Sequence, residues 1–135
     1  MKLSNILLVE DSDSDAAFFQ DFFGRQRICN RITRVVNYQD AWLQLQTGEK
    51  FDLLVVDICS PGNGGLDLVE RIKAFPGYDG VPIIVTSGVD TEESVNEACR
   101  LGVLEFIVKP LTTEKWWPVI QELKKPRIGL MVEVA

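Results

Sequence analysis

Four apolar segments of this chain each end in polar residues that can take part in ionic or phosphoryl chemistry. The polar residues are Glu10 and Asp11, Asp57, Ser87 and Gly88, and Lys109 and Pro110. Short apolar runs bounded by turn residues are typical of buried strands in a parallel sheet. Such sheets keep their chemistry at the carboxyl ends of the strands. We therefore expect acids, a hydroxyl and an amine to meet in one crevice, an arrangement suited to a divalent metal ion and a phosphoryl group.

The expected spacing of the strands decides which of these side chains can meet. Neighbouring strands lie about 4.8 Å apart, so the acids Glu10, Asp11 and Asp57 at the ends of the first and third strands crowd their negative charges together. A divalent cation relieves that repulsion, and a hard oxygen site of this kind suits Mg²⁺ or Mn²⁺. The fifth strand lies about 10 Å from the third by the same spacing, a gap that the long side chain of Lys109 can cross. Ser87, one strand nearer, can donate a hydrogen bond to a phosphoryl oxygen.

The composition excludes several other classes of chemistry. Acids outnumber bases by 20 to 14, which gives a net charge of −6, and the chain has no basic run that predicts direct binding to nucleic acid. It has no histidine, which excludes histidine metal sites, serine-histidine or cysteine-histidine catalysis and a role as a phosphohistidine carrier. A partner must therefore bring any phosphate that this protein handles.

Cysteine usage and the amino-terminal residues bear on the compartment. The three cysteines are widely spaced and lack the CxxC spacing of zinc sites, which predicts reduced thiols. The apolar run after Lys2 meets acids directly after Val9, so it is too short for a signal peptide or a membrane span. We expect a soluble cytoplasmic protein that does not enter a membrane.

Segments with helical periodicity lie between the apolar runs. We expect one helix capped by Asp13 to Asp15 and ended by Gly24, one from Asp40 to Gly48, one from Leu66 to Phe75, one opened by a capping box of Asp90 and Glu93, and one near Pro118 to Lys125. The last helix is placed late because proline is best tolerated in a first helical turn. A run near Arg31 to Asn37 supplies the remaining strand.

The expected elements follow the order strand then helix, repeated five times. Such alternation predicts a parallel sheet with right-handed crossovers and helices on both faces. The runs that polar residues interrupt, at 31–36 and 104–108, suit edge strands, whereas the purely aliphatic runs suit the centre. We therefore predict a flavodoxin-like (βα)5 doubly wound parallel sheet of strand order 2-1-3-4-5 over residues 1–125. Residues 126–135 form a tail that can be a linker stub, a packing arm or an extra strand.

The acidic pair, Asp57, Ser87 and the Lys109-Pro110 pair occur in this order, all at strand ends. In this the chain resembles response-regulator receiver domains of the chemotaxis single-domain type, over about residues 3 to 125. The resemblance implies a two-component signalling domain that assists only its own phosphorylation and dephosphorylation and is not otherwise an enzyme. It implies that Asp57 accepts a phosphoryl group from the phosphohistidine of a sensor histidine kinase or a histidine phosphotransfer protein.

The resemblance also implies how the metal ion is held. Asp11 and Asp57 are expected to bind Mg²⁺, or Mn²⁺, directly, and Glu10 is expected to bind it through water. The backbone carbonyl of Cys59 completes the protein ligands. The following loop keeps the family's proline, but Ser60, Asn63 and Gly64 depart from its usual residues.

The remaining roles concern the phosphoryl group and the output. Lys109 is expected to pair with the phosphoryl oxygens, while the Ser87 hydroxyl and the Gly88 N–H bind them. Thr86 is the alternative to Ser87, because adjacent strand residues face opposite ways. Phe106 occupies the position of an aromatic switch residue, although packing at an edge strand explains it equally well. Output is expected through the face formed by the fourth helix, the fifth strand and the fifth helix, towards an unknown protein partner.

A different class of protein shares part of this pattern. A haloacid-dehalogenase-like phosphohydrolase would use Asp11 as its nucleophile, since Asp11 and Asp13 form an Asp-x-Asp motif after the first strand. The chain lacks the later acidic pair and the capping insertion of that class. Flavin binding is disfavoured because an acidic first loop repels the phosphate that it would have to hold.

Overall fold

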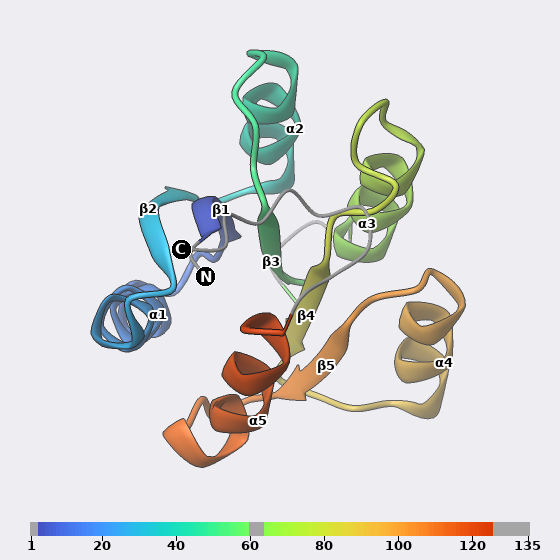
Figure 1. Ribbon diagram of the computed structural model, residues 1–135. Helices are drawn as coiled ribbons and strands as arrows, with labels where there is room; N and C mark the ends of the chain where they lie inside the picture. Colours follow the sequence, from blue (N-terminus) through green and yellow to red (C-terminus); the bar gives the residue numbers. More distant parts are fainter. Residues whose placement is uncertain (1–2, 60–63, 126–135) are drawn as a thin grey trace.

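The structure is a computed structural model that describes residues 3–59 and 64–125, which form alternating strands and helices (Figure 1). The strands are β1 (Leu3–Val9), β2 (Cys29–Val35), β3 (Leu53–Asp57), β4 (Ile83–Ser87) and β5 (Glu105–Val108). The helices are α1 (Asp13–Gln26), α2 (Tyr38–Gln46), α3 (Gly65–Ala74), α4 (Glu92–Arg100) and α5 (Thr113–Leu123). The predicted strand-helix alternation is confirmed.

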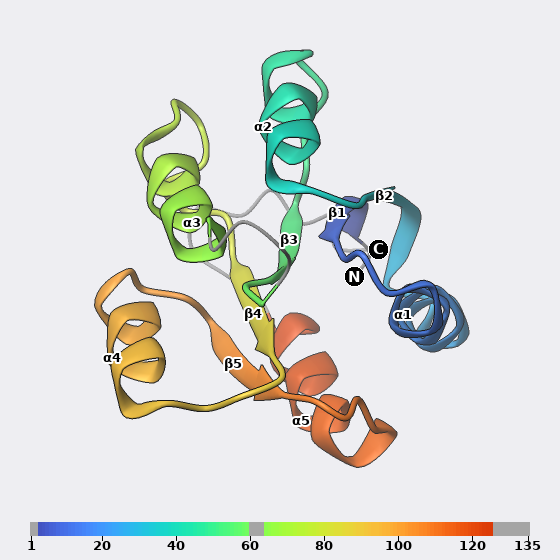
Figure 2. The ribbon, with the colours of Figure 1, turned by 180° about the vertical axis from the view of Figure 1, so that it is seen from behind.

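The strands form one parallel sheet of order β2-β1-β3-β4-β5. This is the predicted flavodoxin-like doubly wound sheet, with the polar-interrupted strands β2 and β5 at its edges. The register pairs Val9 with Val56 and Asp57 with Thr86. The carboxyl ends of β1, β3 and β4 therefore meet at the same edge of the sheet. The connections from β1 to α1 and from β5 to α5 leave this edge and can be followed in Figure 2.

The sheet has a hydrophobic core on each face, because alternate strand residues point to opposite sides. On one face, Ile6 and Leu8 of β1 pack with residues of α1 and α5. On the other face, Leu7 and Val9 pack with residues of α2 and α3. Figures 1 and 2 show α1 and α5 together on the first face and α2, α3 and α4 on the second. Both faces of the sheet are thereby covered, which is why the central strands lack polar alternation.

An aromatic cluster joins α5 to α1. The Trp116 ring is fully buried and meets the rings of Phe19 and Phe23 edge-on, with centroid distances of 4.8 and 5.6 Å. Edge-to-face pairs of this kind contribute about 0.5–1.5 kcal/mol each beyond the burial of apolar area. The phenylalanines of α1 are therefore core residues that fix α5 against the sheet.

Helix α1 does not end where its glycine predicted. Ser12 caps it by accepting a hydrogen bond from the Asp15 N–H, and the helix continues through Gly24 to Gln26. Arg27, with φ of 53°, adopts the left-handed conformation that terminates many helices, and its N–H donates to the Gly24 carbonyl. The prediction of an end at Gly24 was wrong because an isolated glycine costs a helix only about 1 kcal/mol.

Two further helix starts differ from prediction because several capping residues lie close together. Asn37 caps α2 and accepts a hydrogen bond from the Asp40 N–H, 2.7 Å away, so Asp40 lies inside the helix. Thr91 caps α4 and accepts from the Ser94 N–H at 3.1 Å, so Asp90 stands outside it. Strand β2 consequently ends before Asn37, at Val35.

Helix α5 begins well before the predicted position. Thr112 caps it by accepting from the Lys115 N–H, and Pro118 lies inside the helix. The Lys115 ammonium donates to the carbonyls of Val108 and Pro110 at 2.7 and 3.0 Å. These bonds fix the first turn to the end of β5, which outweighs the cost of an exposed proline further along.

The start of α3 is packed unusually closely onto the end of β3. A Cβ atom at Gly65 would lie 2.5 Å from the Cα atom of Ile58, nearer than real Cβ atoms come to backbone. Ile58 directly follows Asp57, so glycine at position 65 allows the helix to approach the backbone beside that carboxylate.

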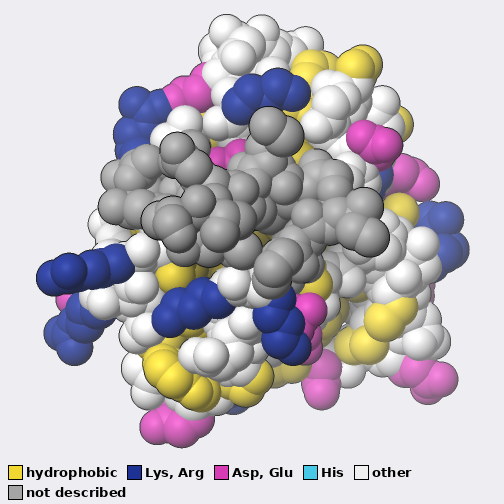
Figure 3. All heavy atoms as spheres, in the orientation of Figure 1, with side chains coloured by type: hydrophobic (Ala, Val, Ile, Leu, Met, Phe, Trp, Pro, Cys, Tyr) yellow, Lys and Arg dark blue, Asp and Glu magenta, His cyan; other side chains and the backbone are white. Residues whose placement is uncertain are grey.

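On the surface, Lys and Arg side chains are scattered among Asp and Glu over the face that Figure 3 shows. None of the described helices has the length and apolar character that crossing a membrane requires. The tail predicted at 126–135 and the loop residues Ser60 and Asn63 lie outside the described residues.

Candidate functional site

The residues after the strands are held by backbone hydrogen bonds that extend the sheet. The Glu10 N–H donates to the Val35 carbonyl at 3.0 Å, and the Lys109 N–H donates to the Ser87 carbonyl at 2.8 Å. The backbone of these residues therefore continues the pairing of β1 with β2 and of β5 with β4. Their side chains start from fixed positions at the carboxyl edge of the sheet.

The structure brings together the acids that follow β1 and end β3. Carboxylate oxygens of Glu10, Asp11 and Asp57 all lie within 4.8 Å of one another. Glu10 is 0% exposed and Asp57 is 3% exposed, whereas Asp11 lies at the surface. The cluster is therefore two buried carboxylates with a third at the opening.

Lys109 crosses from the end of β5 to this cluster. Its ammonium nitrogen lies 3.0 Å from Asp57 Oδ2, 3.1 Å from Glu10 Oε1 and 2.7 Å from Asp15 Oδ2. Burial lowers the pKa of Lys109, but the hydrogen bonds to Asp15, Asp57 and Glu10 outweigh this and raise the pKa above its usual value. The amine is therefore a permanent cation at the centre of the acids.

Asp57 is held at both carboxylate oxygens. Oδ1 accepts a hydrogen bond from the Cys59 N–H at 2.9 Å, and Oδ2 accepts from the Lys109 ammonium at 3.0 Å. The Tyr38 hydroxyl donates to the backbone carbonyl of Asp57 at 2.8 Å. These bonds fix the orientation of the carboxylate, which is the condition for its use as a nucleophile.

Glu10 is the acid whose titration is most altered. Burial raises the pKa of Glu10 to about 7, and the charge of Asp57 acts in the same direction. The Ser12 N–H, which donates to Glu10 Oε2 at 3.1 Å, and the Lys109 ammonium oppose this shift. Arg34 donates to the Glu10 backbone carbonyl at 3.0 Å and also pairs with the Asp13 carboxylate at 2.9 Å.

The acid cluster fits a divalent cation of the Mg²⁺ or Mn²⁺ type. All its side-chain donors are carboxylate oxygens, which hard cations prefer. Glu10 Oε1 is buried and makes no hydrogen bond among the described residues, although it lies within ion-pair distance of Lys109. A buried oxygen without a hydrogen bond, in a site of excess negative charge, can accept a hydrogen bond from a water molecule bound to such an ion.

Ser87 reaches the loop after Asp57 and is tied into a local turn. Its Oγ donates to the Val89 carbonyl at 2.6 Å, accepts from the Val89 N–H at 3.1 Å and lies 2.9 Å from the Cys59 sulfur. A Cβ atom at Gly88 would meet nothing within 4 Å, so the space beside that backbone is open. The Thr86 hydroxyl is buried and has no hydrogen-bond partner among the described residues.

Phe106 lies on β5 and is half-buried. It packs against the core cluster on the face covered by α2 and α3, and its register partner on β4 is Val85. The packing role weighed from the sequence is therefore present, and its role as a switch stays a prediction.

Sequence reasoning missed three residues that complete the site. Asp15 pairs with Lys109, Arg34 binds the Glu10 carbonyl, and Tyr38 binds the Asp57 carbonyl. A signal existed for Asp15, because it lies in the first turn of the helix that directly follows Glu10 and Asp11. Arg34 and Tyr38 gave no sequence signal beyond their place on an edge strand and at a helix start.

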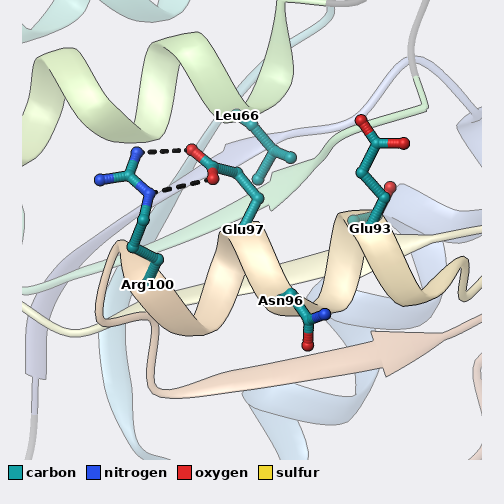
Figure 4. A pocket seen from close by; sticks show the side chains of 6 residues that line it. Leu66, Glu93, Asn96, Glu97 and Arg100 are labelled. Carbon is teal, nitrogen blue, oxygen red and sulfur yellow. Dashed lines mark hydrogen bonds and ion pairs between the residues drawn. The ribbon is translucent and has the colours of Figure 1, made fainter.

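A groove of about 460 Å³ lies away from this site, between α3 and α4. Figure 4 shows Leu66 at its base and the Glu97 and Arg100 side chains joined by hydrogen bonds along α4. Arg100 also reaches Glu70 of α3 at 3.4 Å. The groove therefore contains a surface ion-pair network, and it shares no residue with the acid cluster.

Comparison with known proteins shows the family to which the chain belongs. Residues 6–121 match the family model of the response regulator receiver domain. A two-component response regulator, ORR8 of Oryza sativa subsp. indica, is 24% identical over 111 residues, which cover 82% of this chain and 90% of that protein. A chemotaxis protein CheY homolog of Campylobacter jejuni is 33% identical over 75 residues, 56% of this chain and 58% of its own.

Other relatives are much longer, and solved structures share the fold. The 3',5'-cyclic-nucleotide phosphodiesterase regA of Dictyostelium discoideum is 28% identical over 111 residues, and the match spans 81% of this chain but 14% of that protein. The chemotaxis protein CheY4 of Vibrio cholerae superimposes with a TM-score of 0.78 at 20% identity, over 90% of this chain and 98% of its own.

The fold and the acid cluster with its lysine define a phosphoryl-acceptor signalling domain. The chain belongs to the response regulator receiver domain family. The phosphohydrolase considered as an alternative finds no support in these comparisons.

Proposed function

We propose that Asp57 is the phosphoacceptor and that it receives its phosphoryl group from the phosphohistidine of a cytoplasmic sensor histidine kinase or a histidine phosphotransfer protein. The observation that carries this proposal is a 3% exposed carboxylate held between the Lys109 ammonium and the other acids of the cluster. The receiver domain is proposed to span residues 1–125. It assists its own phosphorylation and dephosphorylation and transfers nothing further.

The reaction is an in-line displacement at phosphorus. A carboxylate oxygen of Asp57 forms the new O–P bond as the P–N bond to the donor imidazole breaks. The imidazole nitrogen keeps the electron pair of that bond, and the imidazole leaves in its neutral form because its other ring nitrogen carries a proton. Because the transition state spreads negative charge over the equatorial oxygens, positioning and electrostatic stabilisation supply the catalysis.

Three residues of the site would receive those oxygens. Lys109 already donates to Asp57 Oδ2, so its ammonium is in place to neutralise charge on an attached phosphoryl group. The Ser87 hydroxyl would have to leave the Val89 carbonyl in order to donate to a phosphoryl oxygen. The open space at Gly88 allows the same group to approach the backbone N–H.

Asp11 and Asp57 would hold the metal ion directly, Glu10 through water, and the Cys59 carbonyl would complete the set. A bound Mg²⁺ would supply positive charge against the acids and the phosphoryl oxygens. The acid cluster supports this assignment, and the response regulator Rcp1, which is 21% identical with a TM-score of 0.76, is described in an Mn²⁺-bound form.

The output is proposed to run through Phe106 to a protein that binds the α4-β5-α5 face. Movement of Ser87 towards the phosphoryl group would change the packing next to β5, where Phe106 is half-buried. Trp117 is an exposed aromatic residue on α5 and so lies on an element of that face.

Intact-mass measurement after treatment with acetyl phosphate and Mg²⁺ tests the assignment of the acceptor. We expect one added phosphoryl group in the wild-type protein, and its loss on chelation of the metal or in Asp57→Asn. Asp79→Asn, which changes an exposed acid outside the cluster, is the matched control and is expected to label normally. Continued single labelling of Asp57→Asn would place the acceptor elsewhere and overturn the proposal.

A further inference from the structure

The ion pairs of Lys109 are not all part of the metal-type cluster. Among the described residues, three carboxylates lie within ion-pair distance of its ammonium, and the shortest of these contacts, 2.7 Å, is to Asp15. Glu10 and Asp57 belong to the cluster of acids that fits a metal ion, and Asp15 does not. Asp15 comes instead from the first turn of α1 and has a side chain that is 28% exposed.

In this arrangement, Asp15 competes with the incoming phosphoryl group for the ammonium of Lys109. In the proposed reaction, Lys109 must direct its N–H groups to the oxygens that arrive on Asp57. An ammonium has three donors, and the one held by Asp15 is bound to a fixed carboxylate on a helix. Asp15 also adds a further negative charge near the acceptor, and this charge repels an anionic phosphodonor.

We propose that Asp15 is a positioning residue that restrains Lys109 in the unphosphorylated protein and slows the phosphorylation of Asp57. This inference rests on the proposed function of Asp57 and Lys109. Asp15 sets how readily the ammonium is released to the phosphoryl group, while the acceptor and the metal ligands remain as they are. It is therefore a determinant of the phosphorylation rate within the receiver site.

The test compares Asp15→Asn with Asp13→Asn. Both substitutions remove one negative charge from the first turn of α1, but the Asp13 side chain is 95% exposed and pairs with Arg34 rather than with Lys109. Initial rates are measured by intact mass with acetyl phosphate and Mg²⁺ at equal ionic strength. We expect Asp15→Asn to be phosphorylated roughly twofold to fivefold faster, the effect of losing one partly exposed ion pair. Asp13→Asn is expected to keep the wild-type rate, and Asp15→Glu to restore it.

A second measurement follows the ammonium itself. The ¹⁵N and ¹H signals of the Lys109 side chain are recorded in the Mg²⁺-bound protein, and we expect them to move in Asp15→Asn and to stay in place in Asp13→Asn. A faster rate without a change in these signals would mean that Asp15 acts only through its charge and not by holding Lys109, and it would overturn the positioning role. Equal or slower phosphorylation of Asp15→Asn would also overturn it. If the wild-type protein and both variants all fail to label at Asp57, the proposed function fails instead.

Discussion

At the scale of single residues, burial and nearby charges together determine the pKa of the Glu10 carboxyl group. Its pKa is raised to about 7 mainly by burial, so the folded, metal-free protein binds a proton at this site more tightly than the unfolded chain does. Between the unfolded value of about 4.5 and pH 7, the free energy of unfolding therefore falls as pH rises. A rise of the pKa from 4.5 to about 7 corresponds to about 3–4 kcal/mol.

We expect Glu10→Gln to remove much of that pH dependence. The neutral amide keeps the shape of the side chain and takes away the buried charge, so the metal-free variant loses less stability than the wild type between pH 5 and pH 8. Urea denaturation with a chelator present measures the difference. Glu105→Gln, at an exposed acid, is the control and is expected to keep the wild-type profile. A wild-type slope in Glu10→Gln would show that other groups produce it.

We expect the lifetime of the phosphorylated form to depend on two side chains beside the proposed acceptor. Cys59 and Val89 are both exposed, and neither carries a strong group to orient an attacking water molecule. The Cys59 sulfur is already in contact with Ser87 Oγ at 2.9 Å. We therefore expect the phosphorylated form to hydrolyse slowly. In the double variant Cys59→Asn, Val89→Glu, we expect hydrolysis to be faster by up to roughly 100-fold, because positioned polar groups can orient the attacking water molecule. Intact mass after removal of the phosphodonor gives the rate, and an unchanged rate would rule this explanation out.

At the same scale, the sequence was sufficient to predict which site residues meet when those residues lie at the ends of strands. Glu10, Asp57 and Lys109 meet because carboxyl ends of parallel strands share an edge. The contact between Lys109 and Asp15 depends on how far α1 is rotated about its axis. That rotation is set by packing of the phenylalanines of α1 against Trp116, which no local pattern specifies.

At the scale of elements, strands were easier to predict than helix ends. Each apolar run predicts a strand at one place. The helix starts are less certain from sequence because two candidate capping residues lie close together, Asn37 and Asp40 for α2 and Asp90 and Thr91 for α4. The choice between them follows from where the preceding strand ends and how the loop crosses the sheet. Helix α5 shows the same effect, because contacts of Lys115 with carbonyls at the end of β5 fix its start.

Pro118 gives a test of this account of α5. It lies inside the helix, is exposed, and has no N–H to donate to the carbonyl of Glu114. We expect Pro118→Ala to raise the free energy of unfolding by about 1–3 kcal/mol, because it restores that hydrogen bond. Chemical denaturation measures the change, with Pro76→Ala, beyond the end of α3, as a control of small effect. A loss of stability in Pro118→Ala would mean that the bend or the ring of Pro118 is needed for packing.

At the scale of the whole molecule, the proposed switch must reach from the acid cluster to α4, β5 and α5. Trp116 is fully buried against α1, and Trp117 is 51% exposed on the same helix, so the two report on different sides of α5. With Mg²⁺ and beryllofluoride, a phosphoryl mimic, we expect tryptophan fluorescence and amide exchange to change on the α4-β5-α5 face. A shift of a few kcal/mol between two packings suffices for this. Changes confined to the loops around Asp11 and Asp57 would contradict the signalling model.

The close approach of Gly65 to Ile58 bears on how this protein can be re-engineered. Any side chain at position 65 would push either α3 outward or the backbone that follows Asp57 inward, since the nearest atom is the Ile58 Cα at 2.5 Å. The surface of α3 therefore cannot be changed at position 65 without also changing the backbone beside Asp57. A graft that gives α3 a new partner-binding surface has to keep the glycine and the local backbone with it, or it will change phosphorylation chemistry along with specificity.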